Sequence, residues 1–399
     1  MARMILNETS YFGAGCRKEV AAELRRRNMK KAFVVTDKDL VKFGVSKLVT
    51  DVLDGAGVAY DVFDDVKANP TIANVQHGLA AFQASKADVI IAIGGGSVMD
   101  TAKAVGIIAE NPEFADVKSL EGTADTKNKS FPIIAFATTS GTAAEVTINY
   151  VITDEEAGRK LVCVDPNDIP IVAFNDAEML MSMPKGLTAA TGMDALTHAI
   201  EAYITPGATP ISDMMTWNSI KFIAENLETA VKDGSNAAAR EGMAYGSYVA
   251  GMAFSNVGLG IVHSMAHPLG ARYDIAHGVA NALLLPYVME YNKPAALKKF
   301  GDIARAMGVD VKGMSEEEAA DAAIEAVRKL SKAIGIPQKL RELGIREEQL
   351  KQLSEDAFID PCTGGNPRKT SPAEILEIYK KALWPPRAGA GRGYGGESY

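Results

Sequence analysis

The chain has 399 residues, 47% of them hydrophobic and 23% charged, which is ordinary for a globular protein and enough for two separate cores. A formal net charge of −8 argues against nucleic acid and against an anionic membrane as the main partner. Three widely spaced cysteines without a CxxC pair, no apolar run of about 18 residues and no charged-then-apolar leader together predict a cytoplasmic protein.

The first half of the chain alternates short apolar runs with helical patterns. An apolar run that ends in polar residues is typical of a buried strand, and strands alternating with helices predict βαβ units and a parallel sheet. Helices are predicted over residues 17–28, from the end of the second strand to about 55, and after the turn 69–71. Strands are predicted over residues 4–12, 31–37, 58–63, 88–93, 132–137 and 169–174, with an antiparallel pair over 149–153 and 160–164.

The first predicted strand, residues 4–12, is short, apolar and terminal. Such a strand needs a partner from elsewhere, and another subunit could supply it. We therefore predict a two-fold homodimer in which the N-terminal strands pair across the axis.

The strand over 88–93 runs directly into Gly94-Gly-Gly-Ser97 and then into a helical pattern. Glycines let a diphosphate approach the backbone, and a helix N-terminus offers free N–H groups to it. Ser97 is placed to cap this helix, with Asp100 in the position of a capping-box acid. A tight strand-to-helix turn gives the same pattern, and the run is not the G-x-G-x-x-G fingerprint.

A second polar run, Thr138-Thr-Ser-Gly-Thr-Ala-Ala-Glu-Val146, follows the strand over 132–137. Small hydroxyl residues at the carboxyl end of a strand lie where open α/β sheets bind ligands. After Pro184 the strands stop, and helical periodicity runs nearly to Leu383. We predict an α/β domain over 1–183, an all-helical domain over 184–384 and a flexible tail over 385–399, which is rich in Gly, Pro and Arg.

A helical pattern over residues 191–200 places Asp194 and His198 four residues apart, on one face of the helix. Alone, such a pair is common on solvated helix faces. Three more of the chain's five histidines, His263, His267 and His277, fall in one short segment. A carboxylate and three histidines suit Fe, Zn, Co or Mn, and an open coordination position marks a catalytic site. The spacing leaves open which three histidines bind.

Taken together, the motifs resemble the iron-containing (group III) alcohol dehydrogenases over roughly residues 1–384. The chain is most similar to family members that interconvert lactaldehyde and 1,2-propanediol, a similarity supported by residues 4–9, 145–153 and 360–368. The family-level resemblance rests on the glycine loop with Asp100 and Lys103, the run from Thr138, the segment 190–198, and the histidine segments that begin at His263 and His277.

The resemblance implies a Rossmann-like parallel-sheet domain for NAD(H), an all-helical domain that holds Fe²⁺, and a cleft between them (the dehydroquinate synthase-like fold). It leaves out His267 as a metal ligand and places it near the metal for proton transfer, with a structural core histidine as the alternative. His77 lies in a predicted helix far from any motif, and we expect it to be solvated. The implied metal ligands are Asp194, His198, His263 and His277, with Asp194, His267 and His277 as the catalytic residues. The residues implied near NAD are Asn69, Gly94, Gly95, Gly96, Ser97, Thr138, Thr139, Thr142, Asn149 and Lys160. The implied substrate pocket includes Asn149, Phe254 and Cys362.

Asp37 is informative apart from the resemblance, because it ends a predicted parallel strand. A carboxylate there can accept hydrogen bonds from ribose hydroxyls and would repel a 2′-phosphate. This predicts NAD over NADP, with an ordinary turn aspartate as the alternative.

The implied reaction is reversible hydride transfer between NAD(H) and a short 2-hydroxyaldehyde or 1,2-diol, with Fe²⁺ as Lewis acid; Zn²⁺ accepts the same ligands. Other small primary alcohols, such as 1,3-propanediol, ethanol or butanol, are the nearest alternative, followed by a Zn-dependent glycerol dehydrogenase. A 3-dehydroquinate synthase-like lyase is disfavoured, because the segment 263–277 offers only Arg272 for a carboxylate or phosphate. A non-enzymatic metal-binding or scaffold protein would show no NADH turnover.

Overall fold

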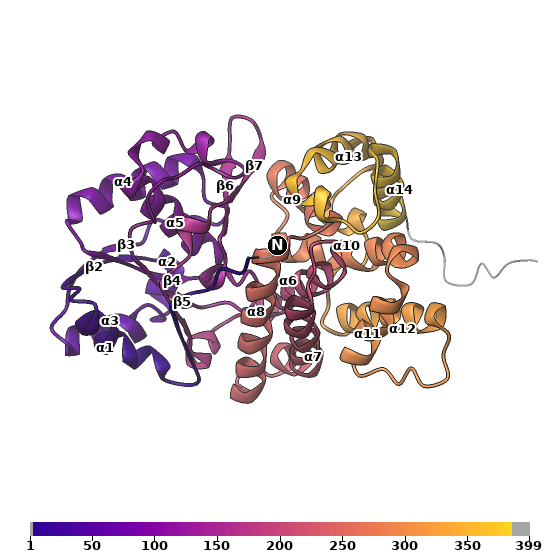
Figure 1. The fold of residues 1–399 in the computed structure, drawn as a ribbon, viewed down its shortest axis with the longest axis horizontal. Helices are drawn as coiled ribbons and strands as arrows, with labels where there is room; N and C mark the ends of the chain where they lie inside the picture. Colours follow the sequence, from indigo (N-terminus) through magenta and orange to yellow (C-terminus); the bar gives the residue numbers. More distant parts are fainter. Residues whose placement is uncertain (1–2, 385–399) are drawn as a thin grey trace, which may run out of the picture.

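The computed structural model describes residues 3–384, so the predicted tail over 385–399 lies outside the described residues. An α/β part and an all-helical part lie side by side along the long axis of the molecule (Figure 1). This arrangement confirms the predicted fold class.

A six-stranded parallel sheet with the order β1-β8-β5-β4-β2-β3 forms the centre of the α/β part. A separate antiparallel pair, β6 and β7, stands between the sheet and the helical part (Figure 1). The strands are β1 Thr9–Phe12, β2 Lys31–Val35, β3 Ala59–Phe63, β4 Val89–Gly94, β5 Ile133–Ala137, β6 Asn149–Asp154, β7 Arg159–Val164 and β8 Val172–Asn175.

Helices cover both faces of the sheet, which explains why its inner strands read as continuous apolar runs. Consecutive residues of β2 point to opposite faces of the sheet. Val34 packs in a cluster with α1 and α3, whereas Phe33 packs in a cluster with α4 and α5. The helices of this part are α1 Val20–Arg26, α2 Lys38–Lys42, α3 Lys47–Gly55, α4 Ile72–Ser85 and α5 Gly96–Glu110.

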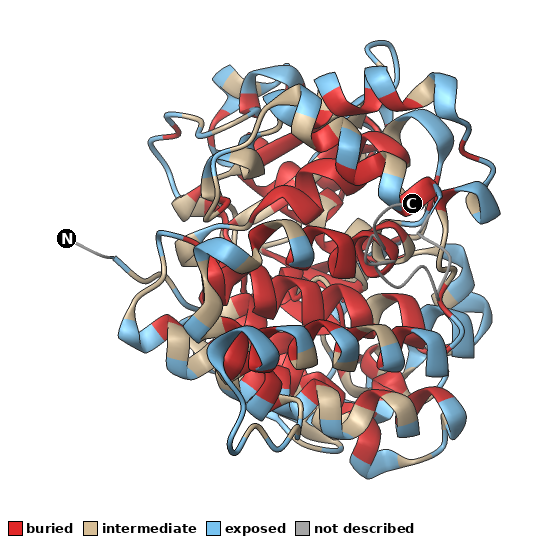
Figure 2. Cartoon of the chain, turned by 90° about the vertical axis from the view of Figure 1, so that its right-hand side faces the viewer, coloured by how far each residue is buried: buried red, intermediate tan, exposed pale blue. Residues whose placement is uncertain are grey.

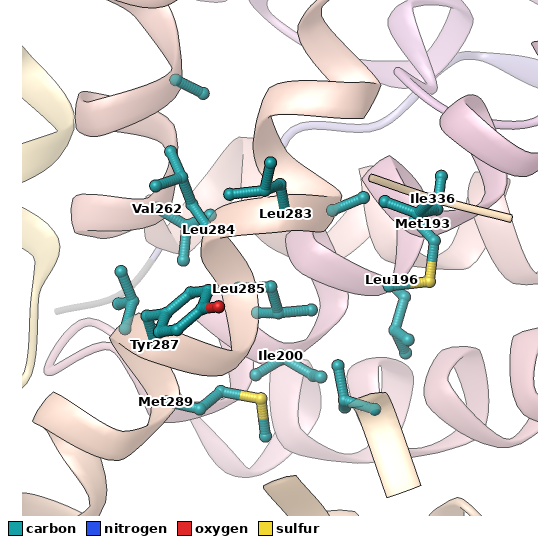
Figure 3. Packing of buried hydrophobic residues seen from close by; sticks show 14 of the residues in the cluster. Met193, Leu196, Ile200, Val262, Leu283, Leu284, Leu285, Tyr287, Met289 and Ile336 are labelled. Carbon is teal, nitrogen blue, oxygen red and sulfur yellow. The ribbon is translucent and has the colours of Figure 1, made fainter. Parts of the chain in front are cut away.

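The all-helical part is built around α6, which is buried along nearly its whole length from Thr188 to Ile204. Its core joins Met193, Leu196 and Ile200 of α6 to apolar side chains of α9 and α10 (Figure 3). Exposed residues gather on the outer faces of the surrounding helices (Figure 2). The helices are α6 Lys185–Ile204, α7 Pro210–Lys232, α8 Ala237–Val257, α9 Ile261–Tyr273, α10 His277–Asn292, α11 Leu297–Ala306, α12 Glu316–Ala333, α13 Leu350–Ile359 and α14 Pro372–Leu383.

The N-terminal segment differs from the prediction. Strand β1 begins at Thr9 rather than at residue 4, and it pairs with β8 of its own chain. Residues before it are held by side chains instead: Asn256 bonds the backbone N–H and C=O of Ile5. The first strand therefore has a partner within its own chain, contrary to the prediction. The homodimer stays a prediction, since β1 forms one edge of the sheet.

Two local predictions in the first half are also corrected. The helix after the second strand is split into α2 and α3, because Gly44 between them has φ of 74°. Helix α5 begins at Gly96 with Gly95 as its N-cap, so Ser97 lies inside the helix and does not cap it. The first N–H groups of α5 therefore have no side-chain cap.

Within residues 3–384, no single helix combines the length and apolar composition needed to cross a membrane. Helices α8 and α9, bent by 101° at the break between them, meet those criteria only as a pair.

Candidate metal centre and cofactor cleft

Four side chains from three helices converge at one point of the helical part. Asp194 and His198 lie one turn apart on α6, His263 lies in the first turn of α9, and His277 begins α10. One ligand atom from each lies within 4.8 Å of the other three. Asp194 Oδ1 is 3.9 Å from His263 Nε2 and 3.5 Å from His277 Nε2. These separations suit atoms that each lie about 2.0–2.2 Å from one shared cation.

Close backbone contacts allow the three helices to meet. A Cβ on Gly278, at the start of α10, would lie 2.4 Å from the Ala190 carbonyl oxygen of α6. A Cβ on Gly260, just before α9, would lie 2.9 Å from Glu201 Oε1. Glycine at both positions therefore lets α9 and α10 approach α6 closely enough to bring the histidines to Asp194.

The electrostatics of the cluster favour a cation. Burial lowers the pKa of His198, lowers that of His263 well below its usual value, and lowers that of His277 to about 4. The imidazoles are thus neutral at ordinary pH, which is the state that binds metals. His198 Nδ1 is buried and has no hydrogen-bond partner in the described structure. The donor set and this orphaned nitrogen both fit a divalent metal ion.

Two further side chains orient the ligands. Glu201 Oε2 lies 2.6 Å from His263 Nδ1, so His263 presents Nε2 to the centre. Asn281 donates from Nδ2 to Asp194 Oδ1 over 2.7 Å. Sequence reasoning missed both residues, although spacing gave a signal: Glu201 follows His198 by three positions and Asn281 follows His277 by four.

His267 lies beside the four candidate ligands but belongs to a different group. Its ring stacks on that of His277, with 5.5 Å between centroids, and its Nδ1 lies 2.7 Å from Asp360 Oδ2. The Cys362 backbone N–H donates to the other oxygen of Asp360 over 2.9 Å. Asp360 was also missed, because 93 residues separate it from His267. Phe254, the predicted pocket aromatic, stacks on His198 at 4.2 Å between centroids.

The glycine loop and the Thr138 run lie together at the carboxyl ends of β4 and β5, which are neighbouring strands. The Thr138 N–H donates to the Gly94 carbonyl over 3.1 Å. A Cβ on Gly95 would lie 3.0 Å from the Thr139 side chain, and one on Gly96 would lie 2.9 Å from that of Thr142. Most of the residues predicted near NAD are thus gathered at the carboxyl-terminal end of the sheet, with Ser97 in the first turn of α5.

Asn69, Asn149 and Lys160 lie outside the parallel sheet, with Asn149 at the start of β6 and Lys160 in β7. Lys160 Nζ donates to Asn69 Oδ1 over 2.9 Å, and burial lowers the pKa of Lys160 to about 8. Asn69 Nδ2 in turn donates over 3.0 Å to Asp274, three residues before His277. Asn149 Oδ1 is buried without a partner in the described structure.

Asp37 lies two residues beyond the end of β2 and caps α2, accepting a hydrogen bond from the Leu40 N–H over 2.8 Å. It is half-buried. The cap satisfies Oδ1, and this local role is compatible with a second role toward a ribose. His77, by contrast, is exposed beside Asp65 and lies in neither group of candidate metal ligands within the described chain.

A parallel α/β sheet with a glycine turn, joined to an all-helical part in which three histidines and a carboxylate cluster, is the architecture of the dehydroquinate synthase-like class of folds. The chain belongs, within that class, to the iron-containing alcohol dehydrogenase family. The family model for "Iron-containing alcohol dehydrogenase" matches residues 7–177, and the model for "Fe-containing alcohol dehydrogenase family, C-terminal" matches residues 188–383. This membership favours a dehydrogenase over the lyase and the non-enzymatic alternatives.

Individual relatives agree with the family over nearly the whole chain. Lactaldehyde reductase of Escherichia coli K12 is 57% identical over 380 residues, which are 95% of this chain and 99% of the relative. The crystal structure of a 1,3-propanediol oxidoreductase has a TM-score of 0.93 at 44% identity, covering 96% of this chain and 100% of that one. Sulfoacetaldehyde reductase from Bifidobacterium kashiwanohense, solved in complex with NAD⁺, has a TM-score of 0.85 at 30% identity, covering 96% and 99%.

Proposed function

We propose that the protein is an NAD- and Fe²⁺-dependent oxidoreductase that interconverts lactaldehyde and 1,2-propanediol. The observation that carries the proposal is the 57% identity to lactaldehyde reductase along 95% of the chain. The clustered ligand set of Asp194, His198, His263 and His277 supports it independently. When bound, Fe²⁺ supplies Lewis acidity that makes the alcohol oxygen more acidic, and NAD⁺ accepts the hydride.

Residues of the helical part have separate roles around the metal. Asp194 and the three histidines hold the ion, and Glu201 fixes the ring of His263. Because the Asp360 carboxylate accepts a hydrogen bond from the Nδ1–H of His267, the Nε2 atom of His267 is left to exchange a proton with the substrate or with water. Phe254, stacked on His198, limits the size of the pocket. Asn149 and Cys362 complete the proposed pocket.

The carboxyl-terminal end of the sheet binds the cofactor in this proposal. The uncapped N–H groups at the start of α5 face the diphosphate, because glycines 94–96 leave the backbone accessible. Asp37 accepts hydrogen bonds from the ribose hydroxyls, and Asn69 and Lys160 lie toward the nicotinamide end. The threonines at 138, 139 and 142 lie at the same end of the sheet.

The proposal includes the assembly of the protein. Two domains, 1–183 and 184–384, enclose the cleft, and two copies associate through the edge of the sheet formed by β1. The enzyme works in the cytoplasm on a small alcohol or aldehyde, without a nucleic-acid or membrane partner.

A second candidate is oxidation of 1,3-propanediol, favoured by the structural match to 1,3-propanediol oxidoreductase at a TM-score of 0.93. Steady-state rates with NADH separate the two, using L-lactaldehyde, 3-hydroxypropanal and acetaldehyde on the iron-loaded protein. The proposal expects kcat/KM for L-lactaldehyde to exceed the other two by about tenfold or more. A preference for 3-hydroxypropanal would favour the second candidate.

A further inference from the structure

Three side chains outside the four-residue centre form a second cluster of potential metal ligands. His267 lies in α9, Asp360 lies at the start of the 3₁₀ helix Pro361–Gly365, and Cys362 lies within that helix. One ligand atom from each, including the sulfur of Cys362, lies within 4.8 Å of the other two. The three residues thus offer a nitrogen, an oxygen and a sulfur donor at one place.

The cluster is held in position by the surrounding fold. The Thr363 and Ser264 hydroxyls are hydrogen-bonded over 2.8 Å, which ties the 3₁₀ helix to α9. The Cys362 N–H donates to Asp360 Oδ1, which fixes the carboxylate relative to the thiol. The side chains of His267 and Asp360 are each 9% exposed, and Cys362 is half-buried. The donors are therefore preorganised, yet solvent reaches the edge of the cluster.

The donor types differ from those of the four-residue centre. That centre offers nitrogen and oxygen alone, whereas this cluster adds a sulfur, and soft thiolate donors select zinc-like ions over Fe²⁺ or Mg²⁺. Three protein donors also leave a fourth tetrahedral position open. We propose that His267, Asp360 and Cys362 form a second divalent-metal site, selective for Zn²⁺ and for thiophilic analogues such as Cd²⁺.

Binding at this site has a defined proton balance. In the metal-free state His267 donates from Nδ1 to Asp360, and Cys362 is a thiol whose pKa is raised well above its usual range, chiefly by burial and also by Asp360. The incoming ion replaces both protons. The thiol proton leaves to solvent, and the imidazole proton moves from Nδ1 to Nε2. One proton is released per ion, and no oxidation or reduction occurs.

Occupation of the second site has a consequence that rests on the proposed function. His267 is the residue proposed to transfer a proton, and its ring stacks on that of His277. An ion on His267, Asp360 and Cys362 takes this imidazole out of proton transfer, while the four ligands of the first centre keep their own metal. Added Zn²⁺ therefore inhibits turnover without displacing the first metal.

The site itself is tested by binding, without turnover. Iron-loaded protein is titrated anaerobically with Cd²⁺ while the ultraviolet thiolate-to-Cd²⁺ charge-transfer band is recorded as a difference spectrum, and equilibrium dialysis counts cadmium and retained iron. We expect one further equivalent of Cd²⁺, the band, and displacement of Cd²⁺ by added Zn²⁺. Exchange at the first centre produces no band, because none of its four ligands is a thiol.

Three variants give the result its specificity. Cys362→Ser abolishes the band and weakens the additional binding by about tenfold or more. Cys16→Ser, which changes another half-buried cysteine outside both clusters, leaves the band and the affinity unchanged. Asp360→Asn keeps the thiol, so the band appears at saturation but at about tenfold higher Cd²⁺. If Cys362→Ser does not fold, the affinity of Asp360→Asn for Cd²⁺ still tests the second site.

Three outcomes would overturn the second site: no additional equivalent of Cd²⁺, an unchanged band in Cys362→Ser, or unchanged affinity in Asp360→Asn. None of them bears on whether the protein reduces lactaldehyde, since no substrate or NADH is present. Conversely, a protein inactive on every aldehyde could still bind Cd²⁺ at this place.

Discussion

Glu201 and His263 are joined by a 2.6 Å contact between a carboxylate oxygen and imidazole Nδ1, and both side chains are buried. The second Glu201 oxygen accepts the N–H of Val262 over 2.7 Å, so the carboxylate is itself fixed by the first turn of α9. The His263 ring is consequently held with Nε2 toward Asp194. A carboxylate behind a ligand histidine sets both the tautomer and the direction of the lone pair.

Glu201→Gln is predicted to weaken metal binding. The amide is a poorer acceptor than the carboxylate and lets the His263 ring turn, so we expect a loss of affinity of about 10- to 100-fold. Competition against a chelator measures this, and the visible spectrum of the Co²⁺-loaded protein reports the ligand geometry. Glu225→Gln, an exposed change on α7, is the control. Equal affinities for the two variants would remove Glu201 from the metal centre.

Asp37→Ser is predicted to relax the choice of cofactor. Serine can still cap α2 at Leu40 but removes the charge that repels a 2′-phosphate, so kcat/KM with NADPH should rise while that with NADH falls. Asp39→Ser, two residues further along the exposed side of α2, is the matched control and should change neither value. If NADPH usage does not respond to Asp37→Ser, the aspartate is only a helix cap.

The stability of the metal-free protein is predicted to fall as the pH drops. The pKa of His277 is about 4 in the folded chain and near 6.5 when unfolded, so between these values the unfolded state binds more protons. Stability therefore rises with pH across this window and levels off above it. His198 and His263, whose pKa values are also lowered, act in the same direction.

Thermal unfolding of metal-free protein between pH 4 and pH 7 measures this slope. We expect His277→Gln to flatten it, because the variant has lost one imidazole whose pKa is lowered in the folded chain. His77→Gln removes a histidine whose side chain is 63% exposed and should leave the slope as it was. A slope equally steep in all three proteins would show that the pKa of His277 is not lowered in the folded chain.

The proposed dimer predicts a change in mass on truncation. Deleting residues 1–7 removes the segment that Asn256 anchors beside the edge strand β1. Light scattering should then report a shift from two copies toward one, whereas Asn256→Ala should loosen the segment with a smaller shift. A monomeric full chain, or an unchanged dimer after truncation, would contradict association through this edge.

The strands and the first two metal candidates follow from sequence alone, because both depend on local periodicity. Asp194 and His198 are four residues apart on one helix, and that spacing is enough to place them on one face. The strand runs are equally local: each face of β2 and β4 is buried under helices, which leaves a continuous apolar signal.

Other features depend on contacts between distant parts of the chain. Asp360 contacts His267 only because a 3₁₀ helix near the C-terminus packs on α9. No local sequence pattern around either residue indicates the other. The separation of His267 from the four clustered ligands came from family resemblance rather than from spacing. The N-cap of α5 is Gly95 rather than Ser97, and a Cβ on Gly94 would lie 2.4 Å from the Val98 side chain, a close approach that composition does not reveal.

The proposed reaction can be tested by anaerobic NADH oxidation with L-lactaldehyde, on protein stripped of metal and reloaded separately with Fe²⁺ and with Zn²⁺. We expect no activity without metal and activity restored by Fe²⁺. Activity with Zn²⁺ alone would contradict the assignment of iron while keeping the reaction. No oxidation of NADH with either metal, on lactaldehyde or any other small carbonyl, would contradict the proposed function itself.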